Sequence, residues 1–446
     1  MPDLDPRGAF RASSAAGPAV EAVNRYARGV GGPGDLDDLI DRLADADCVL
    51  LGEASHGTSE YYRWRAHLTA RLLRDHGFSF VAVEGDWTSC YGVNRYVKGF
   101  DDAHPTAYGA LTAFDRWPTW MWANWEVDGF VSWLRDLNDD RPVGDRAGFY
   151  GLDVYGLYES LHAVIEYLEE VDPEAAEQAR DAYRCFEPYG EDAKEYARAI
   201  QMVPDSCRDE VIEVLSDLRA QAPTYPEETP DDRFDAEQNA LVAANAEEYY
   251  RAMIGGDDDS WNVRDRHMTE TLERLLDHHG PDAKGVVWAH NTHVGDARAT
   301  DMPQHGRINI GQLARERRSI GDTYIVGFGT HRGSVVASDA WGAEMETMTV
   351  PEARHESHGH VFHAAEYDRS LLRSEDLPDG SALDEPRGHR AIGVVYHPAR
   401  ESGNYVPTVL PDRYDAFLHL DETDALHPME RHPEGERVPE LYPSGL

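Results

Sequence analysis

Six short apolar runs, each bounded by polar or glycine residues, recur along the chain. They are rich in β-branched and aromatic residues and too short for helices, so each is predicted to be a buried β-strand. The runs are Cys48–Leu51, Phe78–Val83, Gly148–Leu152, Gly285–Ala289, Tyr324–Phe328 and Ala391–Tyr396. Helical spacing of apolar residues lies between them, as in Val20–Ala27, Leu36–Ala46, Tyr61–Arg74, Asp128–Leu137 and Leu272–His278. This alternation predicts an α/β fold with a mostly parallel central sheet flanked by helices.

The middle of the chain breaks the alternation. Residues 158–280 contain no convincing strand and are rich in Glu, Ala and Arg with helical periodicity. We interpret them as a large helical insertion that caps the active edge of the sheet. Residues 1–157 then form the N-terminal part of the core, residues 281–430 form the C-terminal part of the same core, and residues 431–446 form a loosely ordered tail.

The charge of the chain narrows the partners it can have. Of its 446 residues, 83 are acidic and 42 are basic, which gives a net charge of −41, and only three of the bases are lysines. The acids are spread along the whole chain, which indicates an acidic shell on a folded protein, as expected in a salt-rich (halophilic) cytoplasm where screening suppresses self-repulsion. Such a surface argues against nucleic acid as a partner. No apolar run approaches the ~20 residues of a membrane span, and the N-terminus has no signal pattern, so we expect a cytoplasmic protein with no membrane partner.

Candidate chemistry gathers where the predicted strands end. The first strand runs into Glu53 and His56, and the second into Glu84. The third ends at Asp153, the fourth runs into His290-Asn291-Thr292-His293, and the fifth is followed by His331-Arg332. Because the carboxyl ends of parallel strands meet at one edge of a sheet, these groups are expected to share a crevice.

His56 is the first candidate for a catalytic residue. Imidazole is the side chain best able to move a proton near neutral pH, and a carboxylate three residues away, Glu53, can orient it. Arg65 follows nine residues later on a predicted helix, from which its guanidinium can brace a carboxylate or stabilise an oxyanion. Each residue also has a purely structural interpretation, as a helix cap, a surface ion pair or a core histidine.

Other motifs are set aside or left open. The Gly52–Gly57 segment lacks the spacing of a nucleophile elbow, which makes Ser55 a poor nucleophile, and the chain has no P-loop, no G-x-G-x-x-G after a strand and no H-E-x-x-H. Four widely separated cysteines without a CxxC argue against structural zinc and a disulfide scaffold. A second histidine cluster is expected in a loop, and a dense tryptophan group is either core or a pocket wall. The histidine cluster is His355, His358, His360 and His363. The tryptophan group is Trp117, Trp120, Trp122 and Trp125.

Several of these segments together resemble the erythromycin esterase family. The resemblance rests on Leu51–Gly57, Arg65, Gly77–Glu84, Gly151–Asp153, Arg264–Met268, Val287–His293 and Tyr414–Thr423, and covers most of the chain. It implies an α/β core with a helical insertion, and hydrolysis of a macrolide lactone, the chemistry of antibiotic resistance, with no required cofactor or metal. It assigns the general base to His56 and places Glu53, Arg65, Glu84, His290 and His293 around it. We expect the substrate-binding part of the same site to include Glu60, Asp153, Asp265, His331 and Arg332.

The expected activity is therefore hydrolysis of a small-molecule ester or lactone by water that His56 activates. The natural substrate and the oligomeric state are left open at this stage. Two alternatives also stay open. In one, His56, His290 and His293 are ligands of a metal-dependent hydrolase. In the other, the chain is a non-catalytic binding or stress protein on the same scaffold.

Overall fold

The computed structural model describes residues 17–189, 230–255 and 259–429, together with Cys207, Ile212, Val214 and Leu218. The predicted tail, residues 431–446, lies outside the described residues. The strands are β1 Arg28–Gly29, β2 Cys48–Leu51, β3 Phe80–Asp86, β4 Gly148–Asp153, β5 Gly285–Trp288, β6 Thr323–Ser338, β7 Met345–Val350, β8 Arg369–Arg373, β9 Arg387–Arg390, β10 Tyr405–Thr408 and β11 Ala416–Thr423.

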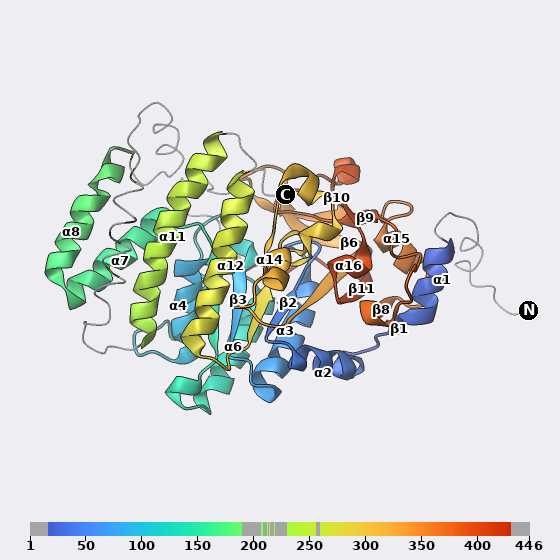
Figure 1. The fold of residues 1–446 in the computed structure, drawn as a ribbon, viewed down its shortest axis with the longest axis horizontal. Helices are drawn as coiled ribbons and strands as arrows, with labels where there is room; N and C mark the ends of the chain where they lie inside the picture. The colour runs from blue at the N-terminus through green and yellow to red at the C-terminus, as the bar shows by residue number, and fades with distance from the viewer. Residues whose placement is uncertain are drawn as a thin grey trace, which may run out of the picture.

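Parallel pairing dominates the central sheet (Figure 1). Across the described part of the chain, nine strands form this sheet in the order β1-β8-β11-β6-β2-β5-β3-β4, with β7 paired to β6. The six strands from β11 to β4 run parallel to one another, whereas β8 and β7 pair antiparallel with β11 and β6. Strands β2, β5 and β3 are parallel neighbours in the middle of the sheet. The residues that follow them therefore lie at one edge of the sheet, where the site forms.

Alternate residues of each central strand face opposite layers of helices. Val49 and Leu51 of β2 pack in one apolar cluster with α2, α3 and α6, and Cys48 and Leu50 pack in the other with α1, α12 and α14. All four side chains are fully buried, as expected for a parallel strand covered on both faces. The helices are α1 Gly17–Tyr26, α2 Asp37–Asp45, α3 Ser59–Asp75, α4 Trp87–Lys98, α5 Ala107–Leu111, α6 Trp125–Asp139, α7 Leu157–Val171, α8 Pro173–Tyr183, α11 Pro230–Gly255, α12 Asp259–His279, α13 Asn291–Val294, α14 Ile310–Glu316, α15 His358–His363 and α16 Leu410–Arg413.

One of the six predicted strands is wrong, and one strand of the parallel part of the sheet was missed. Residues 391–396 form no strand of the sheet; they make only isolated bridges, Ile392 with Ser55 and Val395 with Ser338, because the segment switches partners within three residues. The sixth parallel strand is instead β11, whose buried Phe417, Leu418 and Leu420 are interrupted by histidine and acidic residues. That mixed composition hides the strand in the sequence.

The region between β4 and β5 is helical in its described part. Helices α7, α8 and α11 form an apolar cluster of their own, and Figure 1 places them together at the end of the molecule opposite α1. Helix α12 runs from this group back to the sheet and packs against β4 through the second core cluster. The function of these helices as a cap over the site stays a prediction.

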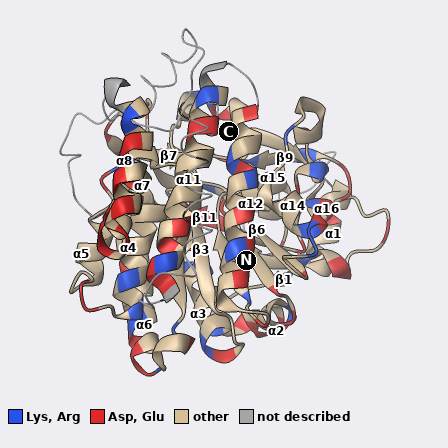
Figure 2. Cartoon of the chain, turned by 60° about the vertical axis from the view of Figure 1, so that its left-hand side comes forward, with Lys and Arg blue, Asp and Glu red and all other residues tan. Residues whose placement is uncertain are grey.

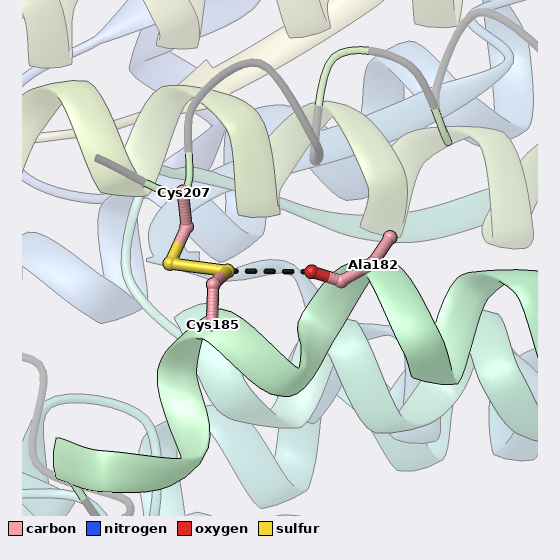
Figure 3. Close-up of a disulfide and its surroundings, with 3 residues drawn as sticks. All are labelled: Ala182, Cys185 and Cys207. Atoms are coloured by element: carbon pink, nitrogen blue, oxygen red, sulfur yellow. Dashed lines mark hydrogen bonds between the residues drawn. A yellow bond between two sulfur atoms is a disulfide. The ribbon is translucent and has the colours of Figure 1, made fainter. Parts of the chain in front are cut away.

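Two of the four cysteines form a disulfide, which the sequence did not predict. Cys185 follows α8 and is bonded to Cys207, with Cα atoms 5.8 Å apart (Figure 3). Cys185 lies in the short 3₁₀ turn Arg184–Tyr189, and its sulfur contacts the carbonyl of Ala182. Cys48 and Cys90 are free and buried, and Cys48 packs in the core as expected from its strand.

Acidic residues, red in Figure 2, are distributed over several helices in that view. Within the described residues, no helix is both long enough and apolar enough to span a membrane. With a net charge of −41, self-repulsion opposes the compact state, and dissolved salt screens it. The Debye length falls from about 10 Å at ~0.1 M salt to about 3 Å at ~1 M.

We therefore expect salt to stabilise the fold. The thermal unfolding midpoint in KCl should rise steeply up to about 1 M and more slowly beyond it, because screening is then nearly complete. Differential scanning calorimetry across a KCl series measures this effect. Sucrose at matched water activity is the control, since it leaves charges unscreened. A midpoint that is flat or falls over the first molar of KCl would contradict the expectation.

Candidate active site

The loop after β2 is held between two other segments by its glycines. A Cβ added to Gly52 would lie 2.0 Å from Oδ1 of Asn291, and one added to Gly57 would lie 1.9 Å from the carbonyl oxygen of Val336. A larger residue at Gly57 would have to move the backbone of Val336, and one at Gly52 would have to displace the side chain of Asn291. The tight loop buries Glu53 and His56 at the carboxyl end of β2.

His56 is bound to a buried carboxylate that is itself bound to an arginine. Nδ1 of His56 lies 2.9 Å from Oε1 of Glu53, and Nη2 of Arg65 lies 2.7 Å from Oε2 of the same carboxylate. Arg65 is fully buried on α3, with its guanidinium stacked over Tyr62 and Trp288. The Glu53 carboxylate accepts a hydrogen bond from Nδ1–H, which leaves the lone pair of the imidazole on Nε2. Nε2 has no hydrogen-bond partner among the described residues.

A second ionic network lies beside this one. Arg264 of α12 donates to both carboxylate oxygens of Asp153, at 2.9 and 2.6 Å, and also to Oε1 of Glu84 at 2.8 Å. The other oxygen of Glu84 accepts from the backbone N–H of His290 at 2.8 Å. All three charged side chains are buried, and each has a partner, as buried charges require.

His293 links Glu84 to Asp265. Its Nδ1 lies 3.0 Å from both oxygens of Asp265, and its Nε2 lies 3.1 Å from Nη1 of Arg264 and 3.4 Å from Oε1 of Glu84. Burial alone would lower the pKa of His293, but the carboxylates of Asp265 and Glu84 raise it above its ordinary value. Burial likewise favours the protonated form of Glu84, yet the charges of His293, His56 and Arg264 outweigh it and hold the pKa of Glu84 well below its usual range.

His290 presents a free donor close to His56. Its Nδ1 accepts from the backbone N–H of Thr292 at 3.2 Å, so its proton is on Nε2. That Nε2 is buried, the backbone of Ala54 interacts with the ring, and the rings of His290 and His56 have centroids 5.0 Å apart. Burial, followed by the charge of His56, holds the pKa of His290 well below its ordinary value, so the ring is neutral.

These networks border a cavity of about 380 Å³. His56, Glu84, Asp153 and Arg264 are among the residues that line it. The rest of its wall comes from loops and is largely aromatic or apolar. It consists of Gly85, Asp86, Phe114, Arg116, Trp117, Pro118, Met121, Trp122, Tyr155, Trp341, Gly393, Val394, Val395, His397, Arg400, Gly403 and Asn404. No Ser, Thr, Cys or Lys occurs among these described lining residues.

The structure thus brings together Glu53, His56, Arg65, Glu84, Asp153, Asp265, His290 and His293 of the residues proposed from sequence. Three others lie elsewhere. Glu60 accepts from the backbone N–H of Asp424, and burial raises its pKa. His331 and Arg332 lie inside β6, which continues to Ser338 instead of ending near Phe328. His331 stacks on His363, and Arg332 is near Glu352 and Glu422.

The structure also gives the positions of Ser55 and of the four tryptophans. The hydroxyl of Ser55 is 2.5 Å from that of Thr58, and Ser55 does not line the cavity. Trp120 belongs to the core, and Trp125 is 54% exposed. The other two members of the tryptophan group, Trp117 and Trp122, line the cavity.

Sequence reasoning missed several lining residues. Arg116, Tyr155, Trp341 and Arg400 reach the cavity from loops and turns that are far apart in the chain. Each is a single residue in an irregular segment, and no spacing pattern marks it. Only the neighbouring Trp117 and Trp122 gave a signal, through their local density.

The described residues do not form a set of metal ligands in this region. In the part of the chain that the structure describes, no three or more His, Cys, Asp or Glu side chains are grouped so that they could hold a metal ion. This applies to His56, His290 and His293 and also to the second histidine cluster. The second cluster was expected in a loop, but His358–His363 form helix α15, which Ser357 caps through its hydroxyl.

Many histidines outside the cavity are buried and neutral. Burial is the main cause that lowers the pKa of His267 and His358 to about 4, and that of His279, His331 and His419 to about 3. In the unfolded chain the same rings take up protons near pH ~6.5. Below that pH the unfolded state binds more protons than the folded state, so stability falls as pH drops from about 6.5 toward 4.

Replacing one such histidine should flatten this dependence. We expect His419→Leu to reduce the slope of the unfolding free energy against pH, between about pH 4 and 6, by about 1.4 kcal/mol per pH unit, because one fewer proton is taken up on unfolding. Urea titrations at a series of pH values measure the slope. His305→Leu, at an exposed position, is the matched control. Equal slopes in His419→Leu and the parent would contradict the burial argument.

Comparison with known proteins identifies the family of the chain. The sequence model of the family described as erythromycin esterase matches residues 73–423. Erythromycin esterase type II from Escherichia coli is 24% identical over 325 residues, which cover 68% of this chain and 73% of that protein. The putative hydrolase YbfO from Bacillus subtilis (strain 168) is 22% identical over 322 residues, covering 68% of this chain and 69% of that one.

Solved structures share the fold. A succinoglycan biosynthesis protein superposes with a TM-score of 0.76 at 20% identity, covering 94% of this chain and 100% of that chain. A mutant of the erythromycin esterase EreC in its open conformation gives a TM-score of 0.63 at 18% identity, covering 86% and 93% of the two chains. At these identities the structures support the fold, while the family match spans most of the sequence. The chain belongs to the erythromycin esterase family of hydrolases.

Proposed function

We propose that the protein hydrolyses a carboxylic ester or lactone with a water molecule activated by His56. One observation carries the proposal: the cavity is lined by an imidazole tied to a buried carboxylate, with no hydroxyl or thiol nucleophile of Ser, Thr or Cys among the lining residues. Such a set fits general-base catalysis rather than an acyl-enzyme. In line with its charge, we place this activity in a salt-rich cytoplasm.

In this mechanism Nε2 of His56 removes a proton from water as the water oxygen attacks the carbonyl carbon. The carbonyl π bond breaks and its electron pair moves onto the oxygen, which becomes an oxyanion. Glu53 holds the imidazole in the productive tautomer and stabilises its protonated form, and Arg65 fixes Glu53. When the tetrahedral intermediate collapses, the bond to the leaving alkoxide breaks, and that oxygen takes the proton back from His56.

The buried Nε2–H of His290, whose ring lies beside that of His56, is our candidate donor to the oxyanion. A neutral imidazole serves this purpose, because it donates one hydrogen bond and does not compete with His56 for the proton. The network of Glu84, Arg264 and Asp153 holds His290 through its backbone N–H and forms one side of the cavity. These three residues position the site and take no proton in the proposed reaction.

Hydrolysis of a panel of esters in high salt tests the proposal. The panel holds simple aryl esters, aliphatic lactones and a macrolide such as the one after which the E. coli relative is named. Each compound is assayed with and without a chelator. Turnover that the chelator leaves unchanged is the expected result. Loss of turnover with chelator and its return with added metal would favour the metal-dependent alternative. A folded protein with no turnover on any member would favour the non-catalytic one.

A further inference from the structure

One cation in the cavity wall lacks a protein partner. Arg400 lines the cavity from the turn Pro398–Gly403, and its guanidinium forms no ion pair or hydrogen bond with another described residue. Arg264 is saturated by Asp153 and Glu84, and Arg116 pairs with Glu159 at 2.9 Å. His397, three residues before Arg400, also lines the cavity and is exposed. Positive charge is therefore available to a ligand on the wall formed by residues 393–404.

The three carboxylates that line the cavity, in contrast, already accept hydrogen bonds from the protein. Glu84 and Asp153 both accept from Arg264. Asp86 caps helix α4 by accepting from the backbone N–H of Ser89 at 3.0 Å and lies 3.3 Å from the hydroxyl of Thr88. A cationic group of a ligand would have to compete for these carboxylates, whereas an anionic group meets a guanidinium with nothing to displace.

Another part of the wall is aromatic, and the indole N–H groups of Trp117 and Trp122 are already used. The rings of Trp117 and Trp341 have centroids 4.6 Å apart. The indole N–H of Trp117 donates to the carbonyl of Ala343, and that of Trp122 donates to the carbonyl of Glu84. What remains for a ligand is ring surface, with Met121 and Phe114 beside it. The volume of about 380 Å³ is at the small end of ligand pockets, which span about 300–1,000 Å³.

We propose that the substrate is a compact ester of flat apolar body that carries one carboxylate or similar anionic group, and that Arg400 determines this specificity by binding the anion. The inference rests on the proposed hydrolase function and adds the substrate class. The apolar body lies against Trp117 and Trp341, the scissile carbonyl faces His56, and the anion faces the wall at Arg400. His397 adds positive charge when protonated.

Two matched ester pairs test the substrate class. In the first pair, the 4-nitrophenyl monoester of glutaric acid is compared with 4-nitrophenyl butanoate, so that the charge is on the acyl side. In the second, 4-acetoxybenzoate is compared with its neutral methyl ester, so that the charge is on the alcohol side. The parent should prefer the anionic member of at least one pair by about tenfold in kcat/KM, as expected for one charge-assisted hydrogen bond.

Variants then assign the preference to one residue. Arg400→Gln should remove the preference, because KM rises more for the anionic ester than for its neutral counterpart. Arg318→Gln removes the same charge from an exposed position away from the cavity and should behave as the parent. A parent that does not discriminate within either pair, or an Arg400→Gln variant that keeps the preference, would overturn the inference while the hydrolase function stands.

A binding measurement separates this inference from the hydrolase proposal. Calorimetric titration with 2-naphthoate and with neutral 2-naphthamide needs no turnover. The parent should bind naphthoate at least about tenfold more tightly than the amide, and Arg400→Gln should bind both alike. If no ester is hydrolysed but this pattern holds, the anion site stands and the hydrolase function fails. If neither probe binds the parent, the inference is wrong.

Discussion

His56→Ala should lower kcat on the preferred ester by about 10²–10⁴-fold, because it removes the proposed general base. The fold should survive, since Glu53 keeps its ion pair with Arg65 when the imidazole is gone. Steady-state kinetics and a urea titration of the same preparation measure the two effects. His305→Ala, at an exposed position, controls for the loss of a histidine. Activity of His56→Ala within a few-fold of the parent would contradict the assignment of the base.

Arg264→Met should cost about 3–5 kcal/mol of unfolding free energy, because it leaves buried carboxylates without their cation. Glu84 and Asp153 both depend on this one guanidinium, and each is less than 5% exposed. Urea or guanidinium titration in high salt measures the loss, which will be accompanied by a lower kcat as the backbone of His290 loses its anchor on Glu84.

Two further variants make this prediction specific. Asp153→Asn combined with Arg264→Met removes one of the stranded charges and should recover part of the lost stability. Arg264→Lys keeps the charge but cannot make the paired contact with Asp153, so it should fall between the parent and Arg264→Met. A loss below about 1 kcal/mol in Arg264→Met would mean that water, rather than the guanidinium, satisfies the two carboxylates.

Local sequence patterns predicted the parallel core and the residues at its strand ends. The runs that became β2, β3, β4 and β5 are short, apolar and sharply bounded, and their pairing follows from burial on both faces. Glu53, Glu84, Asp153 and His290 were found because each follows or ends such a run. The family resemblance and the strand-end argument therefore pointed to the same groups.

Predictions from the sequence failed where the structure depends on contacts between distant segments. β6 continues through His331 and Arg332 because it pairs with β11 and then with β7, and nothing in its own residues marks that extension. The segment at Ile392 has the composition of a strand, but it crosses the loop after β2 and makes single bridges only. Arg400 becomes a candidate only when the partners of every other charge in the cavity are known.

The central claim is that water, and no side chain of the enzyme, attacks the ester. Intact-protein mass spectrometry of the enzyme, quenched in acid during steady-state turnover of a slowly cleaved ester, tests it most directly. We expect the enzyme to keep its unmodified mass at every time point while the acid product accumulates. A species heavier by the mass of the acyl group, which forms and decays in step with turnover, would contradict the account and place a covalent nucleophile in the site.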